Sequence, residues 1–229
     1  MAQLLSALEL STGSAPCFSV IWLHGLGADA NDFVPVVPAL KLPVQFPTRF
    51  IFPNAPHIPV TVNAGYVMPA WYDILEMNIL SRKVDLTGIQ QSVAQVNQFI
   101  QRENERGIPA ERIFLAGFSQ GGAIAYQTAL TYSERLAGVL ALSTYIPDKH
   151  LIEQQFNSVQ CQLPVFVAHG LDDEVVSPAL AQQAFAQLKE LGVQPVWHHY
   201  PMAHEVCMQE VDDIAAWLVA RMHTLKSAN

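Results

Sequence analysis

Short apolar runs alternate along the chain with longer segments whose apolar residues recur every three or four positions. A run that is apolar throughout is typical of a strand covered on both faces, whereas the longer spacing is typical of a helix with one buried face. The runs with the length of buried strands are 18–23, 49–52, 113–116, 136–143, 164–168 and 195–200. Strands that alternate with helices predict an α/β protein with a doubly wound, mostly parallel sheet and helices on both faces.

The helical segments have recognisable limits. The apolar stripe of 86–105 stops before Gly107, and a second stripe begins at Pro178 and stops before Gly192. Further helices are expected at 33–40, from 122 onward, and near the C-terminus, where the apolar face is formed by Val211, Ile214, Ala215, Leu218 and Met222. The segments without a clear period, which are expected to be irregular, are 53–72, 73–83 and 144–163.

Composition narrows the class of protein. The 229 residues can build one substantial core, and because no repeat or linker interrupts them we expect a single domain over residues 1–229. Hydrophobic residues make up 51% and charged residues 14%, which suits a sheet buried on both faces. The net charge of −8 argues against nucleic acid and anionic membrane surfaces as partners.

The cysteines and the absence of long apolar runs indicate where in the cell the protein is expected to be. Cys17, Cys161 and Cys207 are scattered and form no C-x-x-C, so neither a disulfide framework nor a thiolate metal site is expected. The first residues carry no positive charge before their apolar positions, and no uninterrupted apolar run approaches the length of a membrane span. We therefore expect a cytoplasmic protein that is not an integral membrane protein.

The segment Arg112–Tyr126 carries the strongest chemical pattern. Gly117-Phe-Ser-Gln-Gly121 is a G-x-S-x-G sequence between a predicted strand and a predicted helix. A strand that turns directly into a helix strains the residue at the apex and lifts the Ser119 hydroxyl clear of the sheet. The flanking glycines allow close backbone approach, and the N–H of Gln120, at a helix N-terminus, can stabilise an oxyanion. The pattern predicts a nucleophilic serine rather than a glycine-rich turn with an incidental serine.

A second glycine-containing loop follows the first predicted strand. His24-Gly-Leu-Gly27 stands at the strand's carboxyl end, the edge where open α/β sheets bind ligands. Its glycines let backbone N–H groups turn into a pocket, as a second oxyanion donor requires.

A serine nucleophile needs a base, and the base needs an orienting acid. In a hydrolase with this elbow, the chain order is serine, acid, histidine. Asp148 follows one predicted strand beyond Ser119, and Asp172 and Asp173 follow another; position favours the pair at 172 and 173 but does not choose between them.

The base is sought among the histidines. His204, between the last predicted strand and the last helix, is favoured over His198 and His199, which lie inside a strand. His24 and His169 stand beside glycines at strand ends and are expected to organise their loops.

The proline-rich segment 53–72 is long for a structureless loop, and such loops are usually functional. Its apolar residues and those that follow either wall a pocket or plug the core, and the sequence favours neither; they are Met68, Trp71, Tyr72, Ile74 and Leu75.

Several short motifs stand in order between residues 24 and 204. They are His24-Gly-Leu-Gly-Ala-Asp29, Pro53-Asn-Ala-Pro56, Met68-Pro-Ala-Trp-Tyr-Asp73, Gly117-Phe-Ser-Gln-Gly-Gly122, Leu142-Ser-Thr-Tyr145, His169-Gly-Leu-Asp-Asp173 with Val175-Val176, and Tyr200-Pro-Met-Ala-His204. In this arrangement the chain resembles the phospholipase/carboxylesterase family of α/β-hydrolases, which includes bacterial carboxylesterases and acyl-protein thioesterases. The third and fifth motifs lean toward the bacterial carboxylesterase branch.

The resemblance implies an α/β-hydrolase fold without a large cap domain and a serine hydrolase with no metal or organic cofactor. By position in the motifs, Ser119 is the nucleophile, Asp173 the acid and His204 the base. The same correspondence gives the oxyanion hole to the N–H groups of Leu26 and Gln120.

Two residues depart from the family pattern. Glu174 follows the acid where family members often carry proline or aspartate, and Ala203 stands where glycine is common. We expect Glu174 to alter the electrostatics of its loop rather than the role of Asp173.

The favoured function is that of a serine carboxylesterase that hydrolyses short- to medium-chain esters through an acyl-enzyme. The same residues would serve an acyl-protein thioesterase or a lysophospholipase, and a non-catalytic receptor is disfavoured because all three triad members are present. Together with Leu26, the residues expected to wall the acyl slot are Met68, Trp71, Phe118, Leu171 and Met202. The expected partner is a small ester or acyl substrate, and a homodimer is left open.

Overall fold

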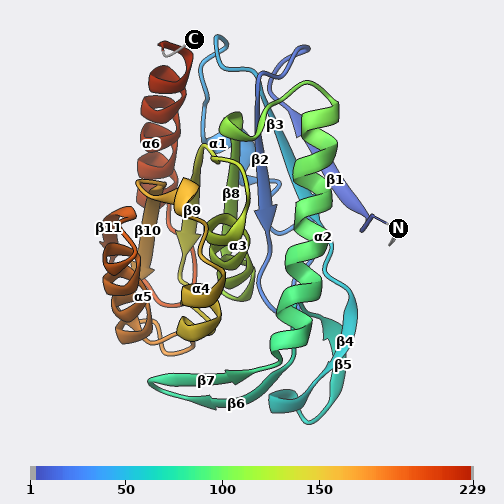
Figure 1. Cartoon of the computed structure of the whole chain (residues 1–229), viewed down its shortest axis with the longest axis vertical. Coiled ribbons are helices and arrows are strands. Elements are labelled where there is room, and N and C mark those ends of the chain that lie inside the picture. The colour runs from blue at the N-terminus through green and yellow to red at the C-terminus, as the bar shows by residue number, and fades with distance from the viewer. Residues whose placement is uncertain (1–3, 228–229) are drawn as a thin grey trace.

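The structure is a computed structural model that describes residues 4–227. Its centre is a seven-stranded sheet with the strand order β1-β3-β2-β8-β9-β10-β11 (Figure 1). Neighbouring strands are parallel, except that β1 runs antiparallel to β3. The strands of this sheet are β1 (Ala7–Ser11), β2 (Phe18–Leu23), β3 (Thr48–Pro53), β8 (Ile113–Phe118), β9 (Gly138–Leu142), β10 (Pro164–Gly170) and β11 (Gln194–Tyr200).

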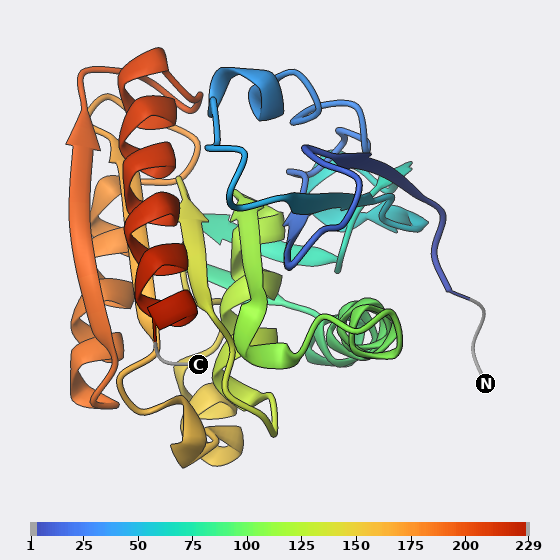
Figure 2. The ribbon, with the colours of Figure 1, turned by 90° about the horizontal axis from the view of Figure 1, so that it is seen from above.

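Helices cover both faces of the sheet, so the predicted fold class is confirmed (Figure 2). One face packs against α2 (Leu86–Glu105), α3 (Gln120–Thr131), α4 (Lys149–Gln155) and α5 (Pro178–Glu190). The other face packs against α1 (Val36–Ala39) and α6 (Met208–Ser227). Successive strand residues point to opposite faces, so Ile21 and Leu115 join the first core whereas Val20 and Phe114 join the second. Because both faces are covered, β2 and β9 are buried along their whole length, as their apolar runs predict.

The segments 53–72 and 73–83 are not irregular, and here the sequence prediction is wrong. They form two antiparallel hairpins, β4 (His57–Val60) with β5 (Tyr66–Pro69) and β6 (Ile74–Asn78) with β7 (Ser81–Val84). Both lie outside the main sheet, so few of their side chains are buried and no regular alternation marks the strands. They stand beyond the carboxyl ends of the parallel strands (Figure 1).

Three smaller corrections concern other elements. The segment 144–163 contains α4, whose N-terminus is capped by Asp148. The helix predicted at 33–40 shortens to the four residues of α1. The edge strand β1 escaped prediction because most of its residues are exposed. Short 3-10 helices complete the fold: η1 (Thr61–Asn63), η2 (Ala110–Arg112) and η3 (Ser158–Gln160).

The helix ends agree with local sequence chemistry. The Asp85 carboxylate accepts hydrogen bonds from the first N–H groups of α2, and Ser177 caps α5, with Pro178 in its first turn. Within residues 4–227, no helix combines the length and the apolar character that crossing a membrane requires.

Candidate active site

Ser119 occupies the turn between β8 and α3 and has φ 53° and ψ −120°. A non-glycine residue in this region is strained and persists only where its surroundings hold it. Its N–H donates to Leu142 O at 2.9 Å, and its carbonyl oxygen accepts from the Thr144 hydroxyl at 2.6 Å. The carbonyl of Leu142 in the neighbouring strand β9 and the hydroxyl of Thr144 just beyond that strand therefore fix the strained serine in place.

The glycines on either side of Ser119 are required by close backbone contact. A Cβ added at Gly117 would lie 2.4 Å from the carbonyl of Gly121. A Cβ added at Gly121 would lie 2.4 Å from Leu23 O and 2.5 Å from His24 O. Gly121 thus lets the start of α3 pack directly on the loop that carries Leu26.

Leu26 and Gln120, whose N–H groups are the predicted oxyanion donors, both line the cavity at Ser119. Gln120 is the first residue of α3, so no earlier helical carbonyl accepts its N–H. Its side chain is held elsewhere, because Oε1 accepts from Trp71 N and Nε2 donates to Tyr72 O, each at 2.8 Å. The N–H group is therefore available to a ligand while the side chain is anchored.

His24 fixes the shape of the Leu26 loop. Its Nε2 accepts from Ala55 N at 3.1 Å, so the ring proton lies on Nδ1 and is donated to Gly25 O at 2.7 Å. Burial lowers the pKa of the His24 ring and outweighs the hydrogen bond to Gly25. The neutral ring organises this loop, as predicted from its position beside a glycine.

Asp173 is a buried carboxylate whose two oxygens are both used. Oδ1 accepts from the N–H groups of Val175 at 2.9 Å and Val176 at 2.8 Å. Oδ2 lies 2.7 Å from His204 Nδ1 and 3.3 Å from His169 Nε2. Burial alone would raise the pKa of Asp173, but the bonds from His169, His204 and Val176 outweigh it and lower the pKa far below its usual range. The carboxylate is charged, so the His204 ring carries a proton on Nδ1.

Backbone contacts hold the Asp173 and His204 loops together. A Cβ at Gly170 would lie only 2.2 Å from Ala203 O. Leu171 N donates to Tyr200 O at 2.9 Å, and Asp172 N donates to Met202 O at 3.1 Å. The position of the histidine relative to the carboxylate is therefore set by the main chain.

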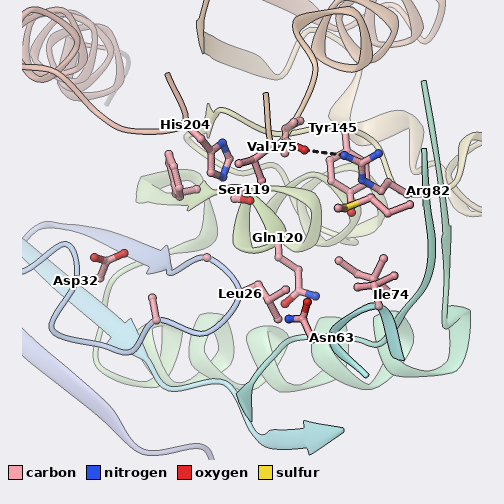
Figure 3. A pocket seen from close by; sticks show the side chains of 16 residues that line it. Leu26, Asp32, Asn63, Ile74, Arg82, Ser119, Gln120, Tyr145, Val175 and His204 are labelled. Carbon is pink, nitrogen blue, oxygen red and sulfur yellow. Dashed lines mark hydrogen bonds between the residues drawn. The ribbon is translucent and has the colours of Figure 1, made fainter. Parts of the chain in front are cut away.

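Ser119 and His204 line one cavity of about 300 Å³, and Figure 3 shows the imidazole beside the serine side chain. Within the described part of the chain, Ser119 Oγ makes no hydrogen bond to His204. Such contacts commonly tighten only in the complex with substrate. The structure thus brings together the serine, the histidine and, through the histidine, the buried aspartate.

The other candidates are placed elsewhere. The Asp172 side chain is exposed, and the Asp148 carboxylate accepts from Leu151 N at 2.7 Å as a helix cap. His198 stacks on Phe166 with ring centroids 4.3 Å apart, on the side of α6. These groups have structural contacts or face solvent, and none lines the Ser119 cavity.

His169 has a contact that the sequence did not reveal. Its Nε2 lies 2.8 Å from Val176 O as well as near Asp173, so it donates a hydrogen bond beside the acid. The sequence places this histidine at a strand end, but only the structure shows that its ring turns toward the carboxylate.

The predicted acyl wall needs correction. Phe118 lines the cavity, but Met68, Leu171 and Met202 do not. The Leu171 side chain is 54% exposed, and Met202 is buried in the core on the α6 face. Met68 lies outside the cavity, with its sulfur 3.3 Å from Asn63 Nδ2. The apolar residues that do line the cavity are Leu26, Ala28, Val62, Ile74, Met77, Phe118, Tyr145, Val175 and Val176.

Trp71 plugs the core instead of walling the cavity. It is 1% exposed, and its Nε1 donates to His24 O at 2.9 Å. Since its backbone N–H also binds the Gln120 side chain, Trp71 braces both loops that carry the candidate oxyanion donors.

We therefore expect Trp71→Ala to act on stability. The loss of a buried tryptophan should lower the free energy of unfolding by about 3–5 kcal/mol, seen as a lower melting temperature. The acyl length at which kcat/KM is greatest should stay unchanged, because Trp71 does not contact the cavity. A change in the preferred acyl length with little loss of stability would instead indicate that Trp71 contacts the substrate.

Among the described residues, no group of three His, Cys, Asp or Glu side chains is placed to hold a metal ion. The chemistry that the cavity itself offers is nucleophilic: a strained serine at the N-terminus of α3 and a histidine hydrogen-bonded to a buried carboxylate.

Comparisons with known proteins agree with this description. The family model described as Phospholipase/Carboxylesterase matches residues 11–222. An acyl-protein thioesterase 1 from Cryptococcus neoformans is 38% identical, over 96% of this chain and 98% of that protein. One from Neurospora crassa is also 38% identical, over 89% of this chain and 86% of that protein. The crystal structure of Arabidopsis thaliana SOBER1 is similar with a TM-score of 0.85 and 31% identity, and it covers 90% of this chain and 99% of that one.

The fold and these matches define the class of protein as an α/β-hydrolase that acts as a serine ester hydrolase. Within that class, the chain belongs to the phospholipase/carboxylesterase family.

Proposed function

We propose that the protein is an acyl thioesterase that releases acyl groups from thioesters, and also from oxygen esters, with Ser119 as the nucleophile. The observation that carries the catalytic part is the placement of Ser119 in one cavity with His204, whose Nδ1 lies 2.7 Å from the buried Asp173 carboxylate. The thioester preference is supported by the relatives that are named acyl-protein thioesterase 1. It replaces the carboxylesterase function that the sequence favoured, which stays compatible with the same site.

The proposed reaction begins with attack of Ser119 Oγ on the acyl carbonyl carbon. The serine proton moves to His204 Nε2, while Asp173 holds the proton on Nδ1 and stabilises the charged ring. The carbonyl oxygen becomes an oxyanion and accepts hydrogen bonds from the N–H groups of Leu26 and Gln120. Collapse breaks the C–S or C–O bond, and the leaving group takes the proton from His204.

Water then attacks the acyl-enzyme. His204 accepts a proton from the water, the second oxyanion forms in the same place, and its collapse releases the carboxylic acid and restores the Ser119 hydroxyl. Besides substrate and water, the proposed steps use only groups of this chain.

The thioester preference is tested with two peptides that carry the same octanoyl group, one on a cysteine sulfur and one on a serine oxygen. We expect kcat/KM to be greater for the thioester after division by each uncatalysed rate. A greater value for the oxygen ester would support the carboxylesterase function instead.

Acyl length is expected to have an optimum. Each methylene of the acyl chain that is buried against Leu26, Ile74, Met77 and Tyr145 should add about 0.8 kcal/mol of binding free energy. This corresponds to a roughly fourfold increase in kcat/KM. The cavity of about 300 Å³ is small, so the gain should stop once it is full. Initial rates on p-nitrophenyl esters should rise from acetate, reach a maximum at short to medium length, and then flatten or fall. A profile that still climbs steeply at palmitate would indicate a lipid-directed enzyme.

A fluorophosphonate should inactivate the enzyme by phosphonylating Ser119 with loss of fluoride, because the tetrahedral adduct places its phosphoryl oxygen where the oxyanion would lie. Peptide mass spectrometry checks this, with Ser119→Ala protein as the control that should stay unlabelled. An adduct on a peptide without Ser119 would contradict the assignment. The cytoplasmic location expected from the sequence stays a prediction, and a homodimer stays open.

A further inference from the structure

One wall of the Ser119 cavity carries a cation. In the β6–β7 hairpin, Met77 stands opposite Arg82, and Glu76 stands opposite Lys83. Neighbouring side chains on a strand point to opposite faces. Met77 and Arg82 line the cavity, whereas Lys83 forms an exposed ion pair with Glu76 at 2.9 Å. Glu76, the one carboxylate of the hairpin, is thus paired with Lys83 on the outer face, and Arg82 faces the cavity.

The guanidinium of Arg82 is held by uncharged groups. Its Nη2 donates to Val175 O at 2.7 Å, and Nη1 donates to Ser81 O at 3.1 Å and to Asn78 O (Figure 3 shows the bond to Val175). The group also lies over the Tyr145 ring, 5.8 Å from its centroid. No carboxylate of residues 4–227 forms an ion pair with it. A guanidinium has more N–H donors than these contacts use, so some remain for a ligand.

The charges of the cavity are separated. The one aspartate in the lining, Asp32, lies on the opposite side from Arg82, with Ser119 between them (Figure 3). A fixed guanidinium loses little further freedom when it binds an anion, and a charge-assisted bond in a partly buried site is strong. In a chain with a net charge of −8, a cation without a carboxylate partner in the Ser119 cavity therefore points to an anionic part of the substrate.

We infer that Arg82 binds a carboxylate at the far end of the substrate's acyl group, so that half-esters and half-thioesters of dicarboxylic acids are preferred substrates. The inference rests on the proposed function, in which Ser119 is acylated. The acyl half is chosen because Arg82 shares its wall with Ile74, Met77 and Tyr145, the apolar residues expected to hold the acyl chain.

The test compares three kinds of ester of matched length: ethyl half-esters of diacids, neutral ethyl esters, and a carboxymethyl ester. Hydrolysis is measured by pH-stat titration. Monoethyl succinate, glutarate, adipate and suberate carry the acyl carboxylate, and the ethyl esters of the equally long monocarboxylic acids are the neutral partners. O-hexanoyl glycolate carries its carboxylate on the alcohol half. For the wild type, kcat/KM should be at least about tenfold greater for one diacid half-ester than for its neutral partner, and this ratio should fall as salt rises.

The variants separate recognition from structure. Arg82→Gln should abolish the preference ratio, Arg82→Lys should keep part of it, and Lys83→Gln, which removes a charge from the outer face of the same hairpin, should leave the ratio unchanged. A purely structural role of Arg82 would lower both activities and leave the ratio intact, which would overturn the inference. A dependence on Arg82 for O-hexanoyl glycolate alone would overturn the choice of the acyl half.

Binding is measured separately from catalysis. Ser119→Ala protein is titrated calorimetrically with monoethyl adipate and with ethyl hexanoate, and the double variant with Arg82→Gln is the control. If the half-ester binds more tightly than ethyl hexanoate, and the difference disappears in the double variant, the anion site is supported. This holds even if no ester is hydrolysed by the wild type, a result that would overturn the proposed function alone. Equal binding of the two esters would overturn the inference whatever the turnover.

Discussion

Ser119→Ala should reduce kcat on any acyl substrate by on the order of 10⁵- to 10⁶-fold and leave a folded protein. The substitution removes the only group that forms the acyl-enzyme in the proposed reaction. It costs little stability, because the serine side chain makes no capping hydrogen bond and its bonds to Leu142 and Thr144 come from the main chain. Single-turnover rates give the catalytic effect, and thermal denaturation checks the fold.

The chain offers a matched control in Ser143. Like Ser119 it is a serine at the end of a strand with positive φ, here 44°, and its hydroxyl is buried without a hydrogen-bond partner. Ser143→Ala should keep most of the activity, because this residue does not line the cavity. If Ser119→Ala retained more than about a tenth of wild-type kcat, where loss of the nucleophile should cost several powers of ten, the nucleophile would have to be sought elsewhere.

Asp173→Asn should lower kcat by up to about 10⁴-fold, through the wrong tautomer of His204. Oδ1 of Asp173 faces the N–H groups of Val175 and Val176, so an asparagine must place its carbonyl oxygen there. Its NH₂ group then faces His204 Nδ1, which can only accept, and the ring proton moves to Nε2. That nitrogen can no longer take the proton of Ser119.

Asp172→Asn is the control for this prediction, since the exposed neighbour loses the same charge without touching His204. Its kcat should stay within about threefold of wild type, as is usual for a surface substitution. Equal and mild effects of the two changes would exclude Asp173 as the orienting acid.

The pH dependence of stability tests independently whether Asp173 is charged in the folded protein. Because its pKa is lower in the folded than in the unfolded protein, the charged carboxylate stabilises the fold above the ordinary pKa of about 3.9. This contribution is lost as pH falls toward the lowered folded-state pKa. The melting temperature of wild type should therefore exceed that of Asp173→Asn at neutral pH, and the difference should shrink below about pH 4.

The elbow could be predicted from the sequence because its constraints are local. Gly117 and Gly121 are needed by contacts with nearby backbone, and the strand and helix that flank Ser119 have clear patterns. The placement of Asp173 and His204 at strand ends could also be predicted, because parallel strands end at one edge. What position alone left open was which carboxylate is buried, since Asp172 and Asp173 differ only in the direction of their side chains.

Leu26 and Phe118 of the cavity wall could be predicted, but the rest of the wall could not, for a different reason. It is built by residues far apart in the chain, such as Val62, Ile74 and Val175, and two of these come from segments without a clear period. Trp71 shows the same limit, because an aromatic residue in a proline-rich loop has the same local pattern whether it plugs the core or contacts substrate. Only the packing of the loop on Gln120 and His24 decides between them.

Leu171 N bonds to Tyr200 O, the last residue of β11, and Asp172 N bonds to Met202 O just beyond it, so this edge strand positions the candidate site as well as completing the sheet. β11 is paired only with β10 in the main sheet, so its register is held from one side. A slip by one residue would carry His204 along the chain direction by about 3.3 Å and turn alternate side chains to the opposite face. The turnover rate should therefore depend on the alignment of β11 with β10. Partial detachment of the C-terminal β11–α6 unit should abolish activity while the rest of the sheet remains folded.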